Sequence, residues 1–163
     1  MSLFYRTLLP SMAAVILLAG CAGSPKETDQ GAPLARQLTA SDHCGLTRPG
    51  LVYLDSLKAQ QAYSSLNGQM FSFAAADNLD FSREHLLVVA LGNKPTGGYG
   101  LTLESASYQD ESLVITAKLR QPPAGAAVTQ VLTTPCVVLA IAAEGWGNIK
   151  VQGHGLTTMT RAR

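Results

Sequence analysis

Few side chains in this sequence have the types and spacing that catalysis or metal binding requires. The three histidines, His43, His85 and His154, stand far apart along the chain, and none has a neighbouring His or Cys at a spacing typical of metal ligands. His43 directly precedes Cys44, an arrangement that could supply a base and a nucleophile. A disulfide at Cys44 would consume that thiol, and the sequence favours this second interpretation.

The common motifs of hydrolases and nucleotide-binding enzymes are also missing. There is no G-x-S-x-G nucleophile elbow, and the glycine-rich stretch 92–100 (GNKPTGGYG) has Lys94 before its glycines, where a phosphate-binding loop has its lysine after them. Glu104, Asp110 and Glu111 fall at or near a predicted hairpin turn, where carboxylates are ordinarily solvated. We therefore predict no catalytic residue, no metal and no cofactor. A hidden enzyme would need a pocket in which a histidine and a carboxylate converge.

The N-terminus has the pattern of a secretory signal. Arg6 precedes a short apolar stretch that closes with Leu-Ala-Gly-Cys at 18–21, which resembles the bacterial lipobox. In that motif cleavage precedes the cysteine, which becomes acylated, so the resemblance implies a signal peptide over 1–20 and lipidation of Cys21. Multiple acyl chains anchor stably, because each buried methylene contributes about 0.8 kcal/mol. Ala22 stands where inner-membrane lipoproteins carry aspartate, which implies an outer-membrane anchor facing the periplasm.

Charge and cysteine content exclude some classes of partner. The sequence has 12 basic and 11 acidic residues, and removal of Arg6 with the signal peptide makes the two numbers equal. No stripe of basic residues indicates binding to nucleic acid or to an anionic membrane surface, so contact with the membrane is expected through the lipid only.

The two other cysteines, Cys44 and Cys136, are an isolated pair, which predicts a disulfide in an oxidising compartment.

The mature chain divides into a polar linker and one ordered domain. Residues 21–43 contain proline, glycine and serine without sustained periodicity, which predicts a lipidated tether. Residues 44–163 are numerous enough for a single hydrophobic core. Within them, 55–68 is the one stretch with convincing helical spacing of apolar residues, and Asp55 or Ser56 can cap it.

The rest of the domain predicts β-strands. Alternating or continuous apolar residues are separated by turn residues about every ten positions, the spacing of a small all-β domain. The predicted strands cover residues 50–56, 85–91, 99–108, 113–120, 126–134, 136–143 and 149–153. This pattern favours a mainly β fold with one helix, either a small β-sandwich or a partly closed barrel.

Three of the predicted loops are unusual in composition. The first, at residues 93–99, combines a proline of fixed φ with two glycines, so we expect a stiff turn whose backbone a partner can approach. The second is rich in proline, and the third presents the single tryptophan of the chain between glycines. Their distinctive residues are Lys94, Pro95, Thr96, Gly97, Gly98 and Tyr99, then Pro123 and Gly125, then Trp146. Two interpretations of Trp146 stay open: an anchor in the core, or an exposed contact, since tryptophan is enriched at binding hot spots.

Residues 85–142 resemble a known family. They are similar to the C-terminal domain of the PrcB-like protease-complex subunits, a group of secreted or lipid-anchored bacterial proteins. The similarity is sharpest at residues 94–99 (KPTGGY) and 128–130 (VTQ). It implies a β-rich accessory module associated with a protease complex and not a protease, and it does not imply the disulfide.

A weaker resemblance is to the chagasin-type inhibitors of papain-like cysteine proteases. Those proteins are small β-sandwiches that present three loops as a wedge. Here the loops at 93–99, 121–126 and 144–148 follow one another in the corresponding order. We predict that they form one recognition surface with Tyr99 and Trp146 as aromatic anchors, which requires them to lie at the same end of the fold.

Together these features predict an outer-membrane lipoprotein that is a non-enzymatic protein-binding module. Its expected partner is an envelope protein such as a protease, which it would stabilise or regulate as an accessory subunit. The alternatives are a chagasin-like protease inhibitor and a structural lipoprotein that binds peptidoglycan or another envelope component through its sheet edge. The sequence predicts no particular oligomeric state.

Overall fold

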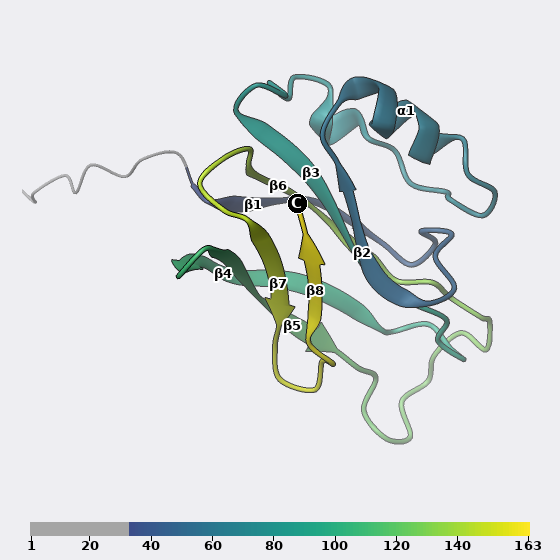
Figure 1. Ribbon diagram of the computed structural model, residues 1–163. Helices are drawn as coiled ribbons and strands as arrows, with labels where there is room; N and C mark the ends of the chain where they lie inside the picture. The colour runs from purple at the N-terminus through teal and green to yellow at the C-terminus, as the bar shows by residue number, and fades with distance from the viewer. Residues whose placement is uncertain (1–32) are drawn as a thin grey trace, which may run out of the picture. The chain divides into compact units, whose positions relative to one another are not determined.

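The structure is a computed structural model that describes residues 33–163, and these residues form two four-stranded sheets (Figure 1). The elements are β1 (Ala35–Ser41), β2 (Pro49–Leu54), α1 (Leu57–Ser64), the 3-10 helix η1 (Ala74–Ala76), β3 (Glu84–Leu91), β4 (Gly100–Gln109), β5 (Ser112–Arg120), β6 (Cys136–Ala142), β7 (Asn148–Gln152) and β8 (Met159–Ala162). The prediction of a mainly β fold with one α-helix is confirmed. The sandwich alternative is the correct one, because the strands form two separate sheets and do not close into a barrel.

The first sheet has the order β1-β6-β3-β2, and all its neighbours are antiparallel. The second has the order β4-β5-β7-β8, with β5 and β7 parallel. The continuous apolar runs of β3 and β6 occupy the two central positions of the first sheet. Strands with both faces covered need apolar residues on both, which explains why these two runs do not alternate.

Two hydrophobic clusters cover the two faces of the first sheet. On one face Leu87 and Val89 of β3 join the core between the sheets, together with Ile115 of β5. On the other face Leu86 and Val88 pack in a second cluster, which also contains Tyr63 of α1 and Ala76 of η1. The helix therefore belongs to the outer face of the first sheet, as Figure 1 shows.

The predicted disulfide between Cys44 and Cys136 is confirmed. Both cysteines are buried in the second cluster, with exposed fractions of 0% and 1%. The bond joins the segment before β2 to the first residue of β6 across a sequence separation of 92 residues. Cys44 is therefore no nucleophile in this state, since its thiol is consumed.

Three local predictions need correction. Residues 35–41, which we assigned to the tether, form β1 and pair with β6, so the linker prediction is wrong for these residues. Residues 126–134, predicted as a strand, contain no named strand and only isolated bridges at Thr133 and Thr134. The helix begins as predicted after Ser56, whose hydroxyl accepts from the Ala59 amide, but it ends at Ser64.

Two predictions concern residues outside the described part of the chain. The signal peptide over 1–20 and the lipidated Cys21 both lie before residue 33. Among the described residues, no helix is long and apolar enough to cross a membrane.

Candidate functional site

The strand register decides which loops share an end of the sandwich. At one end Ala90 pairs with Cys136, and Gly100 pairs with Arg120. The loops 92–99 and 121–135 connect these four strand ends, and we call this the loop end. At the opposite end Glu84 pairs with Ala142, Gln109 with Ser112 and Ser112 with Asn148. The turn 143–147 therefore lies at the opposite end, which we call the tryptophan end (Figure 1).

The predicted three-loop surface is therefore wrong. The first two loops are neighbours at the loop end, while Trp146 lies at the other end of the strands. The physical reason is that β6 alone separates the second loop from the third, and a single strand carries the chain from one end to the other. A chagasin-type wedge cannot form from loops at opposite ends.

Trp146 is a core anchor, the first of its two interpretations. Its exposed fraction is 5%, and it belongs to the cluster between the sheets. Its indole Nε1 donates to the Ala142 carbonyl at 2.7 Å, and its ring meets the Tyr53 ring edge to face at 5.5 Å between centroids. Because the indole is buried and its N–H group is already hydrogen-bonded, Trp146 cannot serve as a contact residue for a partner.

The glycine-rich loop is held against the segment 127–135 by hydrogen bonds. The backbones of Lys94 and Thr133 exchange a pair of bonds, at 2.8 and 3.0 Å. The Gly97 amide donates to the Thr129 carbonyl at 3.0 Å, and the Thr133 hydroxyl donates to the Thr96 carbonyl at 3.0 Å. The two stretches in which the family resemblance is sharpest are therefore in direct contact.

Glycine suits each of the two central positions of the loop, 97 and 98, for a different physical reason. A Cβ atom on Gly97 would lie 2.3 Å from the Thr129 hydroxyl oxygen, so a side chain at this position would force the Thr129 hydroxyl to rotate away. Gly98 has φ of +88°, in the left-handed region that favours glycine. The motif is thus a docking element that fixes the shape of the neighbouring loop.

The other predicted contact residues of the loop end lie on or near its surface. Tyr99 is half-buried, with the Lys94 ammonium 5.5 Å from its ring centroid, a cation–π contact. Pro95, Pro123 and Gly125 are exposed.

Sequence reasoning missed two apolar side chains at this end. Val131 and Leu132 have exposed fractions of 52% and 73%, and they directly precede the anchored Thr133. The sequence pattern predicts a strand over both, and alternation in a strand would bury one of them. Consecutive exposed apolar residues in a loop were the signal that could have found them.

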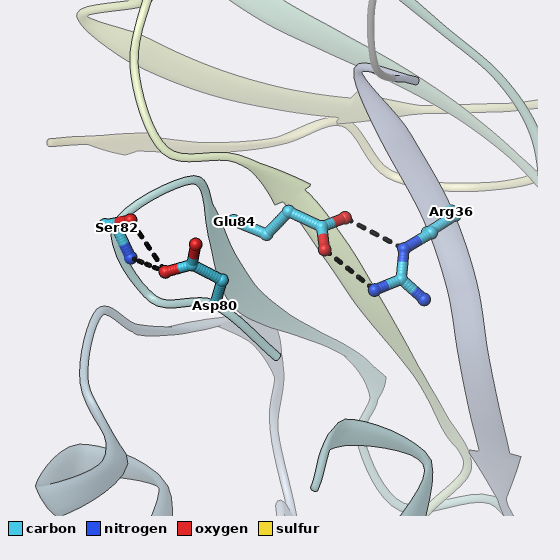
Figure 2. A network of polar contacts seen from close by, with 4 residues as sticks. All are labelled: Arg36, Asp80, Ser82 and Glu84. Carbon is cyan, nitrogen blue, oxygen red and sulfur yellow. Dashed lines mark hydrogen bonds and ion pairs between the residues drawn. The ribbon is translucent and has the colours of Figure 1, made fainter. Parts of the chain in front are cut away.

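Two carboxylates at the tryptophan end, those of Asp80 and Glu84, accept local hydrogen bonds. A hollow of about 370 Å³ there is lined by Pro33, Arg36, Asn78, Asp80, Arg83, Glu84 and Ala142. Arg36 donates two hydrogen bonds of 2.8 Å to the Glu84 carboxylate, and Asp80 accepts from the amide and hydroxyl of Ser82 (Figure 2). The bonds from Ser82 lower the pKa of Asp80, and the bond to Glu84 raises the pKa of Arg36. The lowered pKa favours the charged form of Asp80, the opposite of what a carboxylic acid that donates a proton requires.

The histidines do not assemble with other ligand-type side chains. Within residues 33–163 no group of three or more His, Cys, Asp or Glu side chains could hold a metal ion. A hollow of about 450 Å³ beside the loop end is lined in part by Asp42 and Arg120 but contains no histidine. His85 instead bonds to Tyr53 and to the Phe81 carbonyl.

Comparison with protein families confirms the resemblance to the PrcB-like group. The family model described as PrcB C-terminal matches residues 86–142. The matched part runs from β3 to the end of β6, so it includes both loops of the loop end and excludes Trp146. No curated protein and no solved structure gave a significant match.

Proposed function

We propose that this chain is a non-catalytic accessory subunit that binds a protein partner, a protease of an envelope complex, through its loop end. The match of residues 86–142 to the PrcB C-terminal model supports a link to a protease complex. We choose the loop end as the binding surface because of one observation, the exposure of Val131 and Leu132. Two large apolar side chains stand exposed there on a loop that is held in place at Thr129 and Thr133.

A fixed apolar projection is suited to binding. Ordering a flexible loop costs about 0.5–1.5 kcal/mol for each immobilised side chain, and a loop already held by hydrogen bonds avoids part of that cost. The exposed Met70 lies at the same end, because its amide bonds to the His43 carbonyl and the neighbouring Cys44 amide bonds to Thr134. Exposed apolar side chains gathered at one end are typical of protein interaction sites.

A lipid on Cys21 would leave the loop end accessible. The described chain enters the fold at the tryptophan end, where the Ala142 amide donates to the Leu34 carbonyl and Ala35 pairs with Ile141. This point of entry lies at the end of the strands opposite to Val131 and Leu132. We therefore propose an outer-membrane lipoprotein whose partner-binding end faces the periplasm and points away from the anchor.

Replacement of Leu132 by aspartate tests the proposed surface. We expect recovery of the protease partner in affinity purification from native envelopes to fall at least tenfold, because a charge at a buried contact costs more than about 1.4 kcal/mol. Leu57→Asp is the matched control, since Leu57 is also exposed, at 56%, but lies at the start of α1. Equal recovery of every partner by both variants and the wild type would refute the role of the loop end.

Replacement of Cys21 by alanine tests the anchor. We expect the wild-type protein to incorporate a labelled fatty acid and to fractionate with outer membranes, and the Cys21→Ala variant to lose both properties, because Cys21 carries the only thiol that the lipobox pattern places at the cleavage site. Labelling that persists in the variant would contradict the proposal. The outcome is independent of the Leu132 experiment, so the anchor and the binding surface are tested separately.

A further inference from the structure

Two arginines occupy core-facing positions in the last strand. In the β7–β8 register Ile149 pairs with Arg161, and Val151 pairs with Met159. Residues that pair directly project to the same face of a sheet, and Ile149 and Val151 are in the core between the sheets. Arg161 therefore projects to the core side of β8, and Arg163 follows at the strand period of two. Positions of this kind ordinarily hold apolar residues.

Aromatic rings support both guanidinium groups. Arg161 Cζ lies 5.9 Å from the centroid of the Tyr53 ring, and Arg163 Cζ lies 5.2 Å from that of Trp146. The two rings are themselves in contact, edge to face, at 5.5 Å. Both guanidinium groups thus contact one aromatic pair, at the edge where β2 of the first sheet and β8 of the second meet.

The Tyr53 hydroxyl is oriented by His85. His85 Nε2 faces the Phe81 carbonyl, which can only accept, so this nitrogen carries the proton and Nδ1 accepts from the Tyr53 hydroxyl. Burial raises the pKa of Tyr53, the nearby charge of Arg163 opposes that shift and the carboxylate of Asp55 adds to it. The ring below the arginines is therefore neutral and fixed in place.

Neither guanidinium group lies within ion-pair distance of a carboxylate among the described residues. Across residues 33–163 the one side-chain ion pair within 4.0 Å is between Arg36 and Glu84, on β1 and β3. Arg161 makes a hydrogen bond of 3.5 Å to the Leu51 carbonyl, a long contact that leaves most of its donors free for a ligand.

We infer that Arg161 and Arg163 form a binding site for a phosphate group. Residues two apart in a strand are separated by roughly 7 Å, a span that one phosphate can bridge between two guanidinium groups. Guanidinium presents paired, coplanar donors that match phosphate oxygens, and aromatic support preorganises it.

The phosphate of a lipid headgroup is the occupant that the fold favours. The described chain enters at this same end, through Leu34 and Ala35. If Cys21 is lipidated as proposed above, this end faces the bilayer. The choice of a lipid headgroup as the source of the phosphate rests on that proposal, whereas the phosphate site itself does not. The rival explanation is that inward-pointing charges on β8 protect an edge strand from pairing with another chain.

The single tryptophan provides a direct assay. Trp146 is the only tryptophan of the chain and carries Arg163 over its ring, so its emission should respond to occupancy of the site. The mature protein, held in uncharged sugar-detergent micelles, is titrated with inorganic phosphate in one arm and with phosphatidylglycerol in the other. We expect a saturable change in Trp146 emission with phosphatidylglycerol that the double variant Arg161→Gln, Arg163→Gln weakens at least tenfold.

A charge-matched pair at the loop end serves as the control. The double variant Arg48→Gln, Lys118→Gln removes the same two charges from exposed positions at the other end of the strands and should bind as the wild type does. A response to the lipid alone identifies a headgroup site, and a response to inorganic phosphate, alone or as well, identifies a general phosphate site. No saturable response, or equal weakening by both double variants, would overturn the inference and leave edge protection as the role of these arginines.

Discussion

Replacement of Trp146 by alanine is expected to lower the free energy of unfolding by about 3–5 kcal/mol, the usual cost of removing a large buried aromatic side chain. The indole is 5% exposed, packs against Tyr53 and donates to the Ala142 carbonyl. Urea denaturation followed by far-ultraviolet circular dichroism measures the change, because that signal does not depend on the tryptophan itself.

Trp146→Phe is the matched control for this prediction. Phenylalanine keeps an aromatic ring in the core but loses the hydrogen bond to Ala142, so a smaller loss is expected, and the variant stays measurable if the alanine variant fails to fold. A loss below about 1 kcal/mol for Trp146→Ala would be typical of an exposed site and would contradict the core assignment. A weaker partner interaction in that variant would follow from lost stability, so it would not by itself indicate a contact.

Removal of the disulfide should have a comparable effect. The double variant Cys44→Ala, Cys136→Ala is expected to lower the free energy of unfolding by about 3–5 kcal/mol, because the bond closes a long loop and restricts the unfolded chain. The separation of 92 residues places it among the longer loops, for which the entropic model gives the larger values.

Reduction of the wild-type protein supplies the control. Denaturation of the wild type with a reductant should lower its midpoint toward that of the double variant, which also lacks the two buried sulfur atoms, while the variant itself should not respond to reductant. A variant as stable as the oxidised wild type would show that Cys44 and Cys136 are not bonded in the native protein. A loss of this size would mean that the protein reaches full stability only in an oxidising compartment.

Local patterns predicted much of the fold. The apolar runs at β3 and β6 have both faces covered, and Ser56 caps the helix, since capping and burial leave direct traces in composition. The failures have a different origin. β1 is an edge strand of mostly polar residues, none of them fully buried, and its identity as a strand comes from pairing with β6, which lies about a hundred positions away.

The segment 126–134 explains the error in the candidate site. Its residues alternate like a strand, but its backbone is used to hold the glycine-rich loop at Thr129 and Thr133. If this segment were a strand, two strands would separate the loop at 121–126 from the loop at 144–148. Two successive strands bring the chain back to the end where it started, so both loops would then lie at the loop end. With β6 alone between them, Trp146 must lie at the opposite end.

The amino-acid sequence by itself determined the β class, the cysteine pair and the stiff KPTGGY turn, because strand patterning, thiol count and glycine chemistry act over a few residues or through composition. Only the tertiary structure decided which loops meet, which aromatic side chain is buried and where Arg161 and Arg163 converge. These features depend on strand pairing and on the number of strands between two loops. One segment wrongly assigned as a strand moves every later loop to the opposite end of the predicted fold. The same dependence explains why Val131 and Leu132, unnoticed as a pair in the sequence, became the candidate contact surface.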